Sequence, residues 1–356
     1  MTEPLQFQHA RLRGTLTRDE SMARHVSWRA GGVATLAFKP ADVDDLIAFL
    51  QMTPVEEPVY FVGLGSNLLV RDGGFRGTVV FCHGVLDEIQ LIERNGVALI
   101  QAQAGVAAPK VSRFAARHDL IGAEFMAGIP GTVGGALAMN AGCYGGETWD
   151  VVESVTTLDR AGVLRERSAA DFEIDYRHVV ATDEHGRVKE DRQSPSEPPV
   201  SKGGGASVLT ELSSSSFLLH PWFIAARFRF SRGDGDESRR KIKDFLSLRI
   251  ATQPLGLPNA GSVFRNPPGD HAARLIEASG LKGYTVGGAQ VSMRHANFIV
   301  NQGAASAADI EAVIEHVRET VLTEQGVNLM PEVRIIGEAP VIEEAPGDVH
   351  PAGGER

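Results

Sequence analysis

The chain has 356 residues, which is enough for two or three compact units with a sizeable core. Its 43% hydrophobic and 22% charged residues are typical of a soluble protein. The net charge of −10 argues against non-specific binding to nucleic acid, because a phosphate backbone attracts a basic surface. Cys82 and Cys143 form no CxxC pair, which fits a reducing compartment and argues against structural zinc. The N-terminus shows no apolar signal segment and no apolar run is long enough for a bilayer, so we expect a cytoplasmic protein without a membrane span.

A small first lobe is predicted over residues 1–76. Residues 1–27 carry little periodic signal, and we expect them to wrap the surface. A strand is predicted at 33–38, followed by a helix that opens at Pro40. A buried strand is predicted at 58–62, where the chain is apolar and rich in β-branched and aromatic residues. Together these elements form a β-α-β unit.

A second lobe is predicted over residues 77–235. Its elements are strands at 77–81 and 97–102, a helix that opens at Pro109, a hairpin of 151–158 with 163–166, and a closing strand at 223–230. The stretch 190–216 within it is rich in Ser, Pro, Gly and charge. Such a composition buries too little apolar surface to offset the entropy of ordering. We expect this stretch to be a mobile surface insertion and favour that over a functional lid.

A third unit is predicted over residues 236–340, with a loose tail at 341–356. It carries the clearest helix of the chain, which opens with a capping box of Ser306 and Asp309, continues with an apolar stripe and ends at Gly326. Two further helices are predicted, one around Ile242 and one between Asp270 and Gly280.

Two glycine-rich stretches are the candidate ligand site. The buried strand at 58–62 runs straight into Gly63-Leu64-Gly65-Ser66-Asn67, and the second stretch is a glycine-rich run from residue 128 to residue 147. Glycine lets the main chain approach a ligand closely, and a row of free backbone N–H groups makes an anion site. Neither stretch matches a Rossmann fingerprint or a Walker A loop. The expected ligand is large and flat and carries phosphates; the alternative is a tight crossover that merely needs small residues.

These motifs carry a family resemblance. The stretch VGLGSNLLV at 62–70 and the run GIPGTVGGALAMNAGCYGGE at 128–147 resemble flavoproteins of the vanillyl-alcohol-oxidase or PCMH-type FAD-binding fold. More closely, the chain resembles the UDP-N-acetylenolpyruvoylglucosamine reductase (MurB) family, from about Trp28 to Gly337. The fold class this implies is α+β: a PCMH-type FAD-binding fold of two α/β lobes plus a C-terminal α+β substrate-binding domain.

The resemblance also implies an activity. A protein of this family reduces UDP-N-acetylglucosamine enolpyruvate to UDP-N-acetylmuramate for peptidoglycan synthesis, with NADPH as hydride donor and non-covalent FAD. The implied partner is a UDP-sugar, with no nucleic acid, and we expect a monomer. Two alternatives stay open: another enzyme of the same flavin fold, such as a 2-hydroxy-acid or sugar oxidase, and a flavin electron-transfer subunit.

Three residues match the family's catalytic motifs. Ser262 lies in a Gly-Ser-Val-Phe-Arg-Asn-Pro segment and is the implied proton donor, the alternative being a turn serine. Glu332, in Pro-Glu-Val-Arg, is implied to assist protonation; the alternative is an ion pair with Arg334 or another basic group. Arg177, in Asp-Tyr-Arg-His, is implied to bind the substrate carboxylate. Val179 stands where the family has a serine, so this motif is broken, unless the insertion splits it and the pattern resumes near residue 216.

Further site residues are predicted by type and position. The cofactor-binding set comprises Gly63, Gly65, Ser66, Asn67, Gly128, Ile129, Pro130, Gly131, Gly134, Gly135, Asn140, Ala141, Gly142 and Arg334. The substrate-binding set comprises Arg249, Gln253, Asn266, Lys282 and Gln290, each with a solvated surface role as the alternative. We expect no metal site, because the histidines near the insertion lack ligand spacing.

Overall fold

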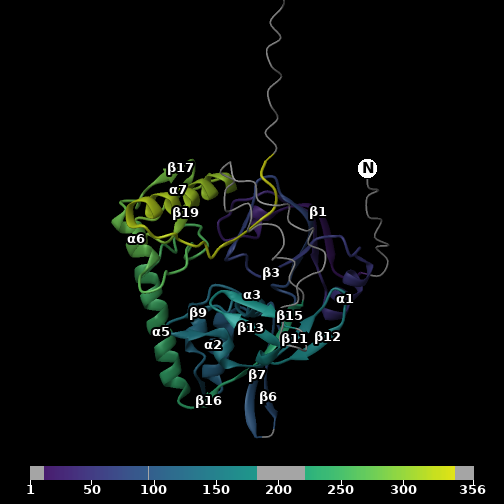
Figure 1. Ribbon diagram of the computed structural model, residues 1–356. Coiled ribbons are helices and arrows are strands. Elements are labelled where there is room, and N and C mark those ends of the chain that lie inside the picture. The colour runs from purple at the N-terminus through teal and green to yellow at the C-terminus, as the bar shows by residue number, and fades with distance from the viewer. Residues whose placement is uncertain (1–11, 95, 183–220, 341–356) are drawn as a thin grey trace, which may run out of the picture.

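A computed structural model describes residues 12–94, 96–182 and 221–340 of the chain. The predicted insertion at 190–216 and the predicted tail at 341–356 lie outside these residues. Three groups of elements are visible: a purple N-terminal lobe, a blue and teal second lobe, and a green to yellow C-terminal part (Figure 1). Helix α5 (Gly235–Thr252) runs along one side of the molecule, from the second lobe toward the C-terminal part.

The first lobe is built on a four-stranded sheet with the order β1-β2-β5-β3. Its strands are β1 (Thr15–Ser21), β2 (Val33–Lys39), β5 (Phe75–Phe81) and β3 (Val59–Val62). Strand β1 is antiparallel to β2, whereas β5 is parallel to both β2 and β3. Helix α1 (Val43–Met52) begins after an Asp42 N-cap and not at Pro40, and it buries Leu46 and Phe49 against this sheet.

Two sequence predictions for this lobe were wrong. Residues 15–21, expected to wrap the surface, form the edge strand β1. Its side chains are mostly exposed, so the apolar alternation that reveals a half-buried strand is missing. Residues 77–81, assigned to the second lobe, belong to β5 and lie between β2 and β3 in the first sheet. We keep the division into lobes as a proposal, with this strand moved to the first lobe.

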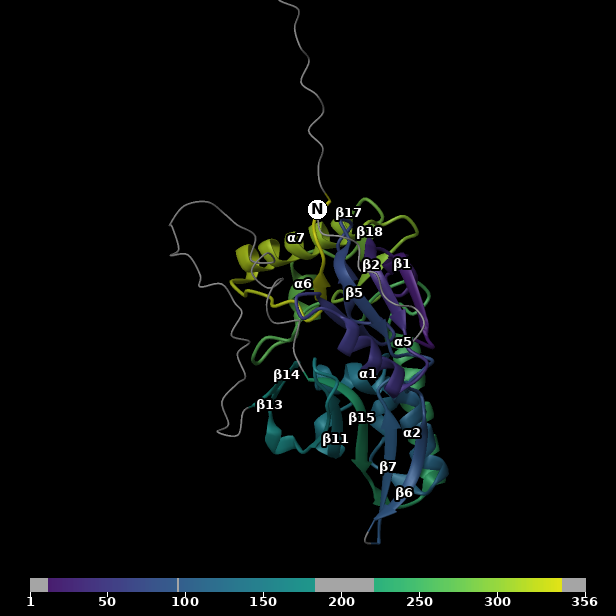
Figure 2. The ribbon, with the colours of Figure 1, turned by 90° about the vertical axis from the view of Figure 1, so that its right-hand side faces the viewer.

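The second lobe is built on a five-stranded antiparallel sheet with the order β12-β11-β15-β7-β6. Its strands are β12 (Leu164–Arg167), β11 (Val152–Leu158), β15 (Trp222–Arg229), β7 (Val97–Gln103) and β6 (Ile89–Arg94). Helices α2 (Ala108–Arg117) and α3 (Val133–Ala138) contribute to the same apolar core. A two-stranded hairpin of β13 (Phe172–Asp175) and β14 (His178–Ala181) ends in the turn that carries Arg177. Figure 2 shows this hairpin beside β11 and β15.

The C-terminal part packs helices against a small antiparallel sheet with the order β17-β18-β19. Its elements are α6 (Ala272–Ala278), β17 (Thr285–Val286), β18 (Ala289–Val291), β19 (Ile299–Asn301) and α7 (Ala307–Gln325). The capping box of Ser306 and Asp309 is present in α7, and Gly326 ends the helix with a φ of 68°, as predicted. Its apolar stripe is buried in the core of this part.

The chain then returns to the first lobe. Strand β20 (Arg334–Ile336) pairs in parallel with β4 (Leu68–Val70), the short strand that follows the first glycine loop. Because of this pairing, the Pro-Glu-Val-Arg segment lies beside the glycine loop, although 265 residues separate Asn67 from Glu332. The end of the C-terminal part therefore lies against the first lobe.

Candidate functional site

A cavity of about 400 Å³ lies where the three parts meet. Its walls are the first glycine loop, the second glycine run, the β13–β14 hairpin, the end of α5, and the segments around residues 261 and 332. This volume falls within the usual range of small-molecule sites. No single lobe encloses the cavity, so it exists only in the assembled fold.

The two glycine stretches form one wall, and their glycines serve two purposes. A Cβ at Gly63 would lie 2.3 Å from Thr132 Oγ1, so this glycine lets the two stretches touch each other. By contrast, the atoms nearest to a Cβ at Gly131 and at Gly135 would be 3.5 and 3.7 Å away. Both of these residues line the cavity, where side chains would take up its space. The stretches therefore pack tightly at Gly63 and leave open space at Gly131 and Gly135.

The predicted cofactor residues line this cavity, with the exception of Asn140. Asn140 is buried and its side chain is used locally: Nδ2 donates to Glu147 Oε2 at 2.7 Å, and Oδ1 accepts from the Trp149 backbone N–H at 3.2 Å. The residue also has a φ of 38°, in the left-handed region that asparagine tolerates. Its side-chain hydrogen bonds therefore stabilise the segment in which the chain reverses direction after α3.

A flat, phosphate-bearing cofactor fits the cavity. The glycine walls leave room for main chain to approach a ligand, and the Thr132 side chain caps the N-terminus of α3 by accepting from the Gly135 N–H. Arg334 brings a cation to the same part of the cavity, and its Nε donates to Met139 Sδ in the second glycine run at 3.4 Å. Burial holds the pKa of Arg334 below its ordinary value. Among the residues described here, no three His, Cys, Asp or Glu side chains are grouped so that they could hold a metal ion.

The segments of Ser262 and Glu332 run side by side. The Glu332 N–H donates to the Val263 carbonyl at 2.8 Å, and the Arg265 N–H donates to the Met330 carbonyl at 2.9 Å. The buried side chain of Asn297 lies on the other side of the Ser262 segment, where it bonds both backbone groups of Phe264. Asn297 Oδ1 accepts from the Phe264 N–H, and Asn297 Nδ2 donates to the Phe264 carbonyl. Ser262 and Glu332 both line the cavity as a result.

Asn67 ties the first glycine loop to this pair of segments. Its Nδ2 donates to the Glu332 carbonyl at 2.9 Å, and its own carbonyl accepts from the Arg334 N–H at 2.9 Å. The residue predicted to contact a cofactor therefore also sets the position of Glu332 relative to the cofactor wall.

Arg177 reaches the same wall from the turn of the β13–β14 hairpin. Its Nη2 lies 3.2 Å from Glu332 Oε1, and both side chains are largely buried. The alternative reading of Glu332 as an ion-pair partner is thus realised, with Arg177 as the cation. Val179, which breaks the family motif, packs in the second-lobe core and is 8% exposed. The substitution therefore fits a packing role and leaves Arg177 within reach of Glu332.

Two features of this group set its electrostatics. Glu332 is only 7% exposed, and burial raises its pKa above the ordinary value although Arg177 and Tyr176 pull in the other direction. The Nε of Arg177 is buried and has no hydrogen-bond partner within the described part of the chain. A buried donor without a partner is costly, so this atom is suited to an acceptor supplied by a ligand.

Two of the predicted substrate residues lie at the cavity. Arg249 and Gln253 line it from the end of α5, and Arg249 Nε donates to Gln253 Oε1 at 3.0 Å. This bond holds the guanidinium group at the end of the helix, where it faces the space between the lobes.

The other three predicted substrate residues are absent from the cavity lining in this conformation. Their side chains bond within the C-terminal part instead: Asn266 accepts from the Ala272 N–H, Lys282 pairs with Glu277, and Gln290 donates to Thr285.

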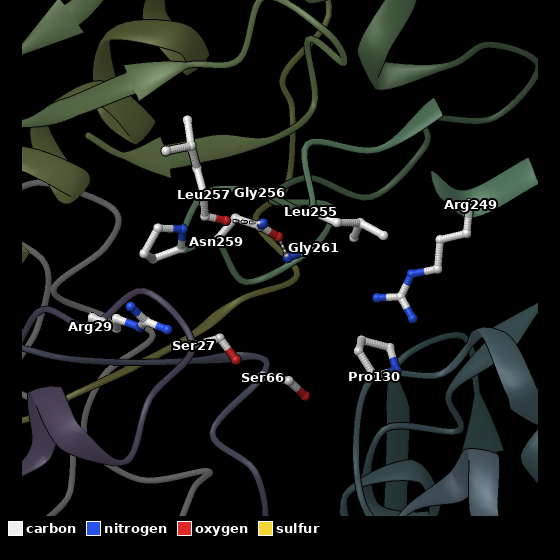
Figure 3. A pocket seen from close by; sticks show the side chains of 11 residues that line it. Ser27, Arg29, Ser66, Pro130, Arg249, Leu255, Gly256, Leu257, Asn259 and Gly261 are labelled. Atoms are coloured by element: carbon white, nitrogen blue, oxygen red, sulfur yellow. Dashed lines mark hydrogen bonds between the residues drawn. The ribbon is translucent and has the colours of Figure 1, made fainter. Parts of the chain in front are cut away.

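A second pocket of about 300 Å³ opens beside the cavity and shares with it Ser66, Pro130, Arg249 and Gly261. Figure 3 shows Arg29, Ser27 and Ser66 along one side, with Arg249 on the other. Asn259 lies between these groups. Two guanidinium groups and several hydroxyl or amide groups thus face one polar opening next to the main cavity.

Sequence reasoning missed three residues of the site: Tyr176, Asn297 and Arg29. Tyr176 stood in the quoted motif next to Arg177, but nothing in the pattern showed that its hydroxyl would reach Glu332. Asn297 acts through a tertiary contact with a segment 33 residues away, which no local pattern shows. Arg29 gave no local signal of its place beside the glycine loop.

Known proteins resemble this chain over most of its length. The family model described as UDP-N-acetylenolpyruvoylglucosamine reductase, C-terminal domain, matches residues 253–336, and one described as FAD binding domain matches residues 34–168. The chain is 51% identical to a UDP-N-acetylenolpyruvoylglucosamine reductase of Thiobacillus denitrificans, over 92% of this chain and 94% of that protein. The chain belongs to the UDP-N-acetylenolpyruvoylglucosamine reductase family.

Other members of the family support the same membership. A reductase of this name from Nitrosospira multiformis is 55% identical, over 93% of this chain and 91% of that protein. The crystal structure of the Thermus caldophilus reductase (MurB) superposes with a TM-score of 0.67 at 25% identity, covering 91% of this chain and 99% of that one. The chain is thus an FAD-dependent oxidoreductase, and the predicted α+β fold with an FAD-binding part is confirmed. No helix in the described ranges is long and apolar enough to cross a membrane.

Proposed function

We propose that this chain reduces UDP-N-acetylglucosamine enolpyruvate to UDP-N-acetylmuramate, a step of peptidoglycan precursor synthesis, with NADPH as hydride donor and non-covalently bound FAD. The observation that carries the proposal is the meeting of Arg177 and Glu332 at 3.2 Å on a cavity wall that also holds Ser262. Family membership supplies the substrate class, because the named relatives are reductases of this compound.

Arg177 and Glu332 have roles that their surroundings support. The guanidinium of Arg177 suits a bidentate contact with the substrate carboxylate, and its Nε, which has no partner among the described residues, offers a second donor for it. Negative charge develops at this carboxylate during the reaction, and a fixed cation beside it stabilises that charge. Burial raises the pKa of Glu332, which supports a role for its protonated form as a hydrogen-bond donor at the same place.

Ser262 supplies the proton to the carbon that becomes C2 of the lactyl group. Its hydroxyl is a weak acid, and only a strongly basic, enolate-like carbon can take a proton from it. Bound FAD would supply the hydride chemistry, and the residues predicted for the cofactor, apart from Asn140, line the wall that would hold it. Arg249 and Gln253 hold the UDP-sugar; both line the cavity, and Arg249 also lines the polar opening beside it, which supports this role.

Steady-state assays distinguish this function from its alternatives. Purified protein with FAD should turn over NADPH repeatedly only when UDP-N-acetylglucosamine enolpyruvate is present, and mass spectrometry should show a product heavier by two hydrogen atoms. Oxygen uptake with a 2-hydroxy acid or a sugar, and no NADPH consumption with the enol ether, would instead identify an oxidase. Transfer of electrons only to an added protein acceptor would identify an electron-transfer subunit.

We also propose that the protein acts as a monomer in the cytoplasm. The support for a monomer is that one chain contributes walls of the cavity from all three parts of the described fold. Light scattering of the holoprotein should give the mass of one chain, and fractionation of cells should place the activity with the soluble fraction.

A further inference from the structure

The side chain of Tyr176 contacts the catalytic carboxyl group from the solvent side of the site. Its hydroxyl donates to Glu332 Oε2 at 3.2 Å, while Arg177 Nη2 lies 3.2 Å from Glu332 Oε1. Each oxygen of the carboxyl group therefore has its own partner. Tyr176 is 42% exposed, whereas Glu332 is 7% exposed, so the phenol lies between the buried carboxyl group and bulk water.

Two cations fix the ring of Tyr176. The guanidinium carbons of Arg177 and Arg265 lie 5.4 and 6.0 Å from the ring centroid, within the range of cation–π attraction. Arg265 Nη1 also donates to the Tyr176 carbonyl at 3.4 Å. Since Arg265 sits in the segment that pairs with Met330, the phenol, Glu332 and the Ser262 segment form one connected unit.

We propose that Tyr176 is a positioning residue of the reductase reaction, whose hydroxyl holds the Glu332 carboxyl group in the orientation that the substrate half-reaction needs. The inference rests on the proposed function, since it concerns the same site. It assigns Tyr176 no contact with the substrate; the residue acts through Glu332.

The charged groups around Glu332 set the expected pH effect. Arg177 and Arg265 face it, and Arg334 follows it on its own segment. Burial raises the pKa of Glu332, whereas the Tyr176 hydrogen bond lowers it. Removal of the hydroxyl takes away one of the contacts that lower the pKa of Glu332, so this pKa rises further. If the protonated carboxyl group is the active form, activity falls as pH rises through the pKa of Glu332. In Tyr176→Phe, this descending limb of the pH–activity profile moves to higher pH.

The test is the Tyr176→Phe variant of the full-length holoenzyme, studied by anaerobic stopped flow. Phenylalanine keeps the ring between the two arginines and removes only the hydroxyl. Loss of one such hydrogen bond should slow substrate reduction about three- to tenfold near neutral pH. Flavin reduction by NADPH and the melting temperature should stay unchanged. Tyr284→Phe is the matched control, because that ring stacks on His316 in the C-terminal part.

A double-mutant cycle separates action through Glu332 from a general structural role. In a Glu332→Ala background, Tyr176→Phe should cause no further slowing of single-turnover substrate reduction. The inference is overturned if Tyr176→Phe has no effect, if it slows both half-reactions equally without moving the pH limb, or if its effect persists undiminished in Glu332→Ala. Failure of the wild-type protein to reduce the enol ether would overturn the proposed function itself, which keeps the two failures distinguishable.

Discussion

At the scale of single residues, Glu332 is held where its charge is unfavourable. Its surroundings offer Arg177 and Tyr176 as partners, yet burial dominates and raises its pKa. The reason is that a carboxylate removed from water loses more hydration energy than two partial contacts return. Such a group lowers the stability of the fold when it is ionised, and this effect can be measured.

Glu332→Gln should therefore stabilise the protein, and more so as pH rises. The pKa of Glu332 in the folded state lies above the ordinary value of 4.5. Its contribution to the free energy of unfolding is therefore fully present below pH 4.5 and is lost as pH rises through the folded-state pKa. Glutamine mimics the protonated form of the carboxyl group, so the variant does not lose this stability as pH rises. Urea unfolding should show a gain in stability for the variant at pH 8 and no gain at pH 4. An equal difference at both pH values would contradict this account.

Ser262→Ala should separate the two half-reactions. The hydroxyl is needed only when the substrate carbon takes a proton, so flavin reduction by NADPH should stay nearly intact. Substrate reduction should slow by about 10²- to 10⁴-fold, the usual contribution of a positioned proton donor. Stopped-flow absorbance of the flavin reports both rates on the same sample. A parallel fall of both rates would show that Ser262 is not the proton donor.

The residue types of the site could be predicted from the sequence better than their contacts. Ser262, Glu332 and the glycines stand in local motifs, which a single sequence is enough to show. The hydrogen bonds of Asn140 depend on how the chain reverses after α3, which no motif shows. The departure at Val179 placed Arg177 in doubt, and only the hairpin geometry places it beside Glu332.

At the scale of elements, the site depends on two short segments that run side by side. The segment of Ser262 and the segment of Glu332 exchange backbone hydrogen bonds, and the buried side chain of Asn297 bonds both the N–H and the carbonyl of Phe264. Neither segment is a long strand. The position of the Ser262 segment therefore also relies on side-chain bonds, and Asn297 supplies two of them.

Asn297→Ala should destabilise the fold and displace Ser262. Two buried backbone groups of Phe264 would lose their partners, at about 1–3 kcal/mol each. Substrate reduction should slow in single-turnover experiments, because the hydroxyl of Ser262 is no longer held. Ser306→Ala is the control: loss of that helix cap should cost about 1 kcal/mol without slowing substrate reduction. Equal slowing in both variants would show that stability alone governs the rate.

The elements that sequence patterns predicted best are those with one buried face. Helix α7 has a capping box, an apolar stripe and a left-handed glycine at its end, and all three were readable. Strand β1 escaped prediction because it is a polar edge strand. The place of β5 in the first sheet could not be predicted either, because the apolar pattern of a strand does not indicate which strands it pairs with.

At the scale of the whole molecule, several contacts tie the C-terminal part to the first lobe. Trp28 Nε1 donates to the Ile299 carbonyl, and Asn301 Nδ2 donates to the Trp28 carbonyl. Arg71 contacts both carboxylate oxygens of Glu311 on α7. With the β4–β20 pairing, these contacts fix one wall of the cavity against the others.

Asp72→Ala should weaken this connection selectively. The Asp72 carboxylate accepts from the N–H groups of Ala307 and Ala308 at the start of α7, so it caps a helix across the interface. Asp42 caps α1 in the same way but within its own segment, which makes Asp42→Ala a matched control. Both variants should lose about 1 kcal/mol of stability. Only Asp72→Ala should raise the KM for the UDP-sugar; an equal rise in both would contradict the role of the interface.

The measurement that tests the central claim most directly is anaerobic sequential mixing of the wild-type holoenzyme. The flavin is first reduced with NADPH and then mixed with UDP-N-acetylglucosamine enolpyruvate, while the flavin spectrum is recorded. The account predicts rapid return of the oxidised spectrum together with formation of UDP-N-acetylmuramate. A flavin that stays reduced until oxygen or a protein acceptor is added would contradict it.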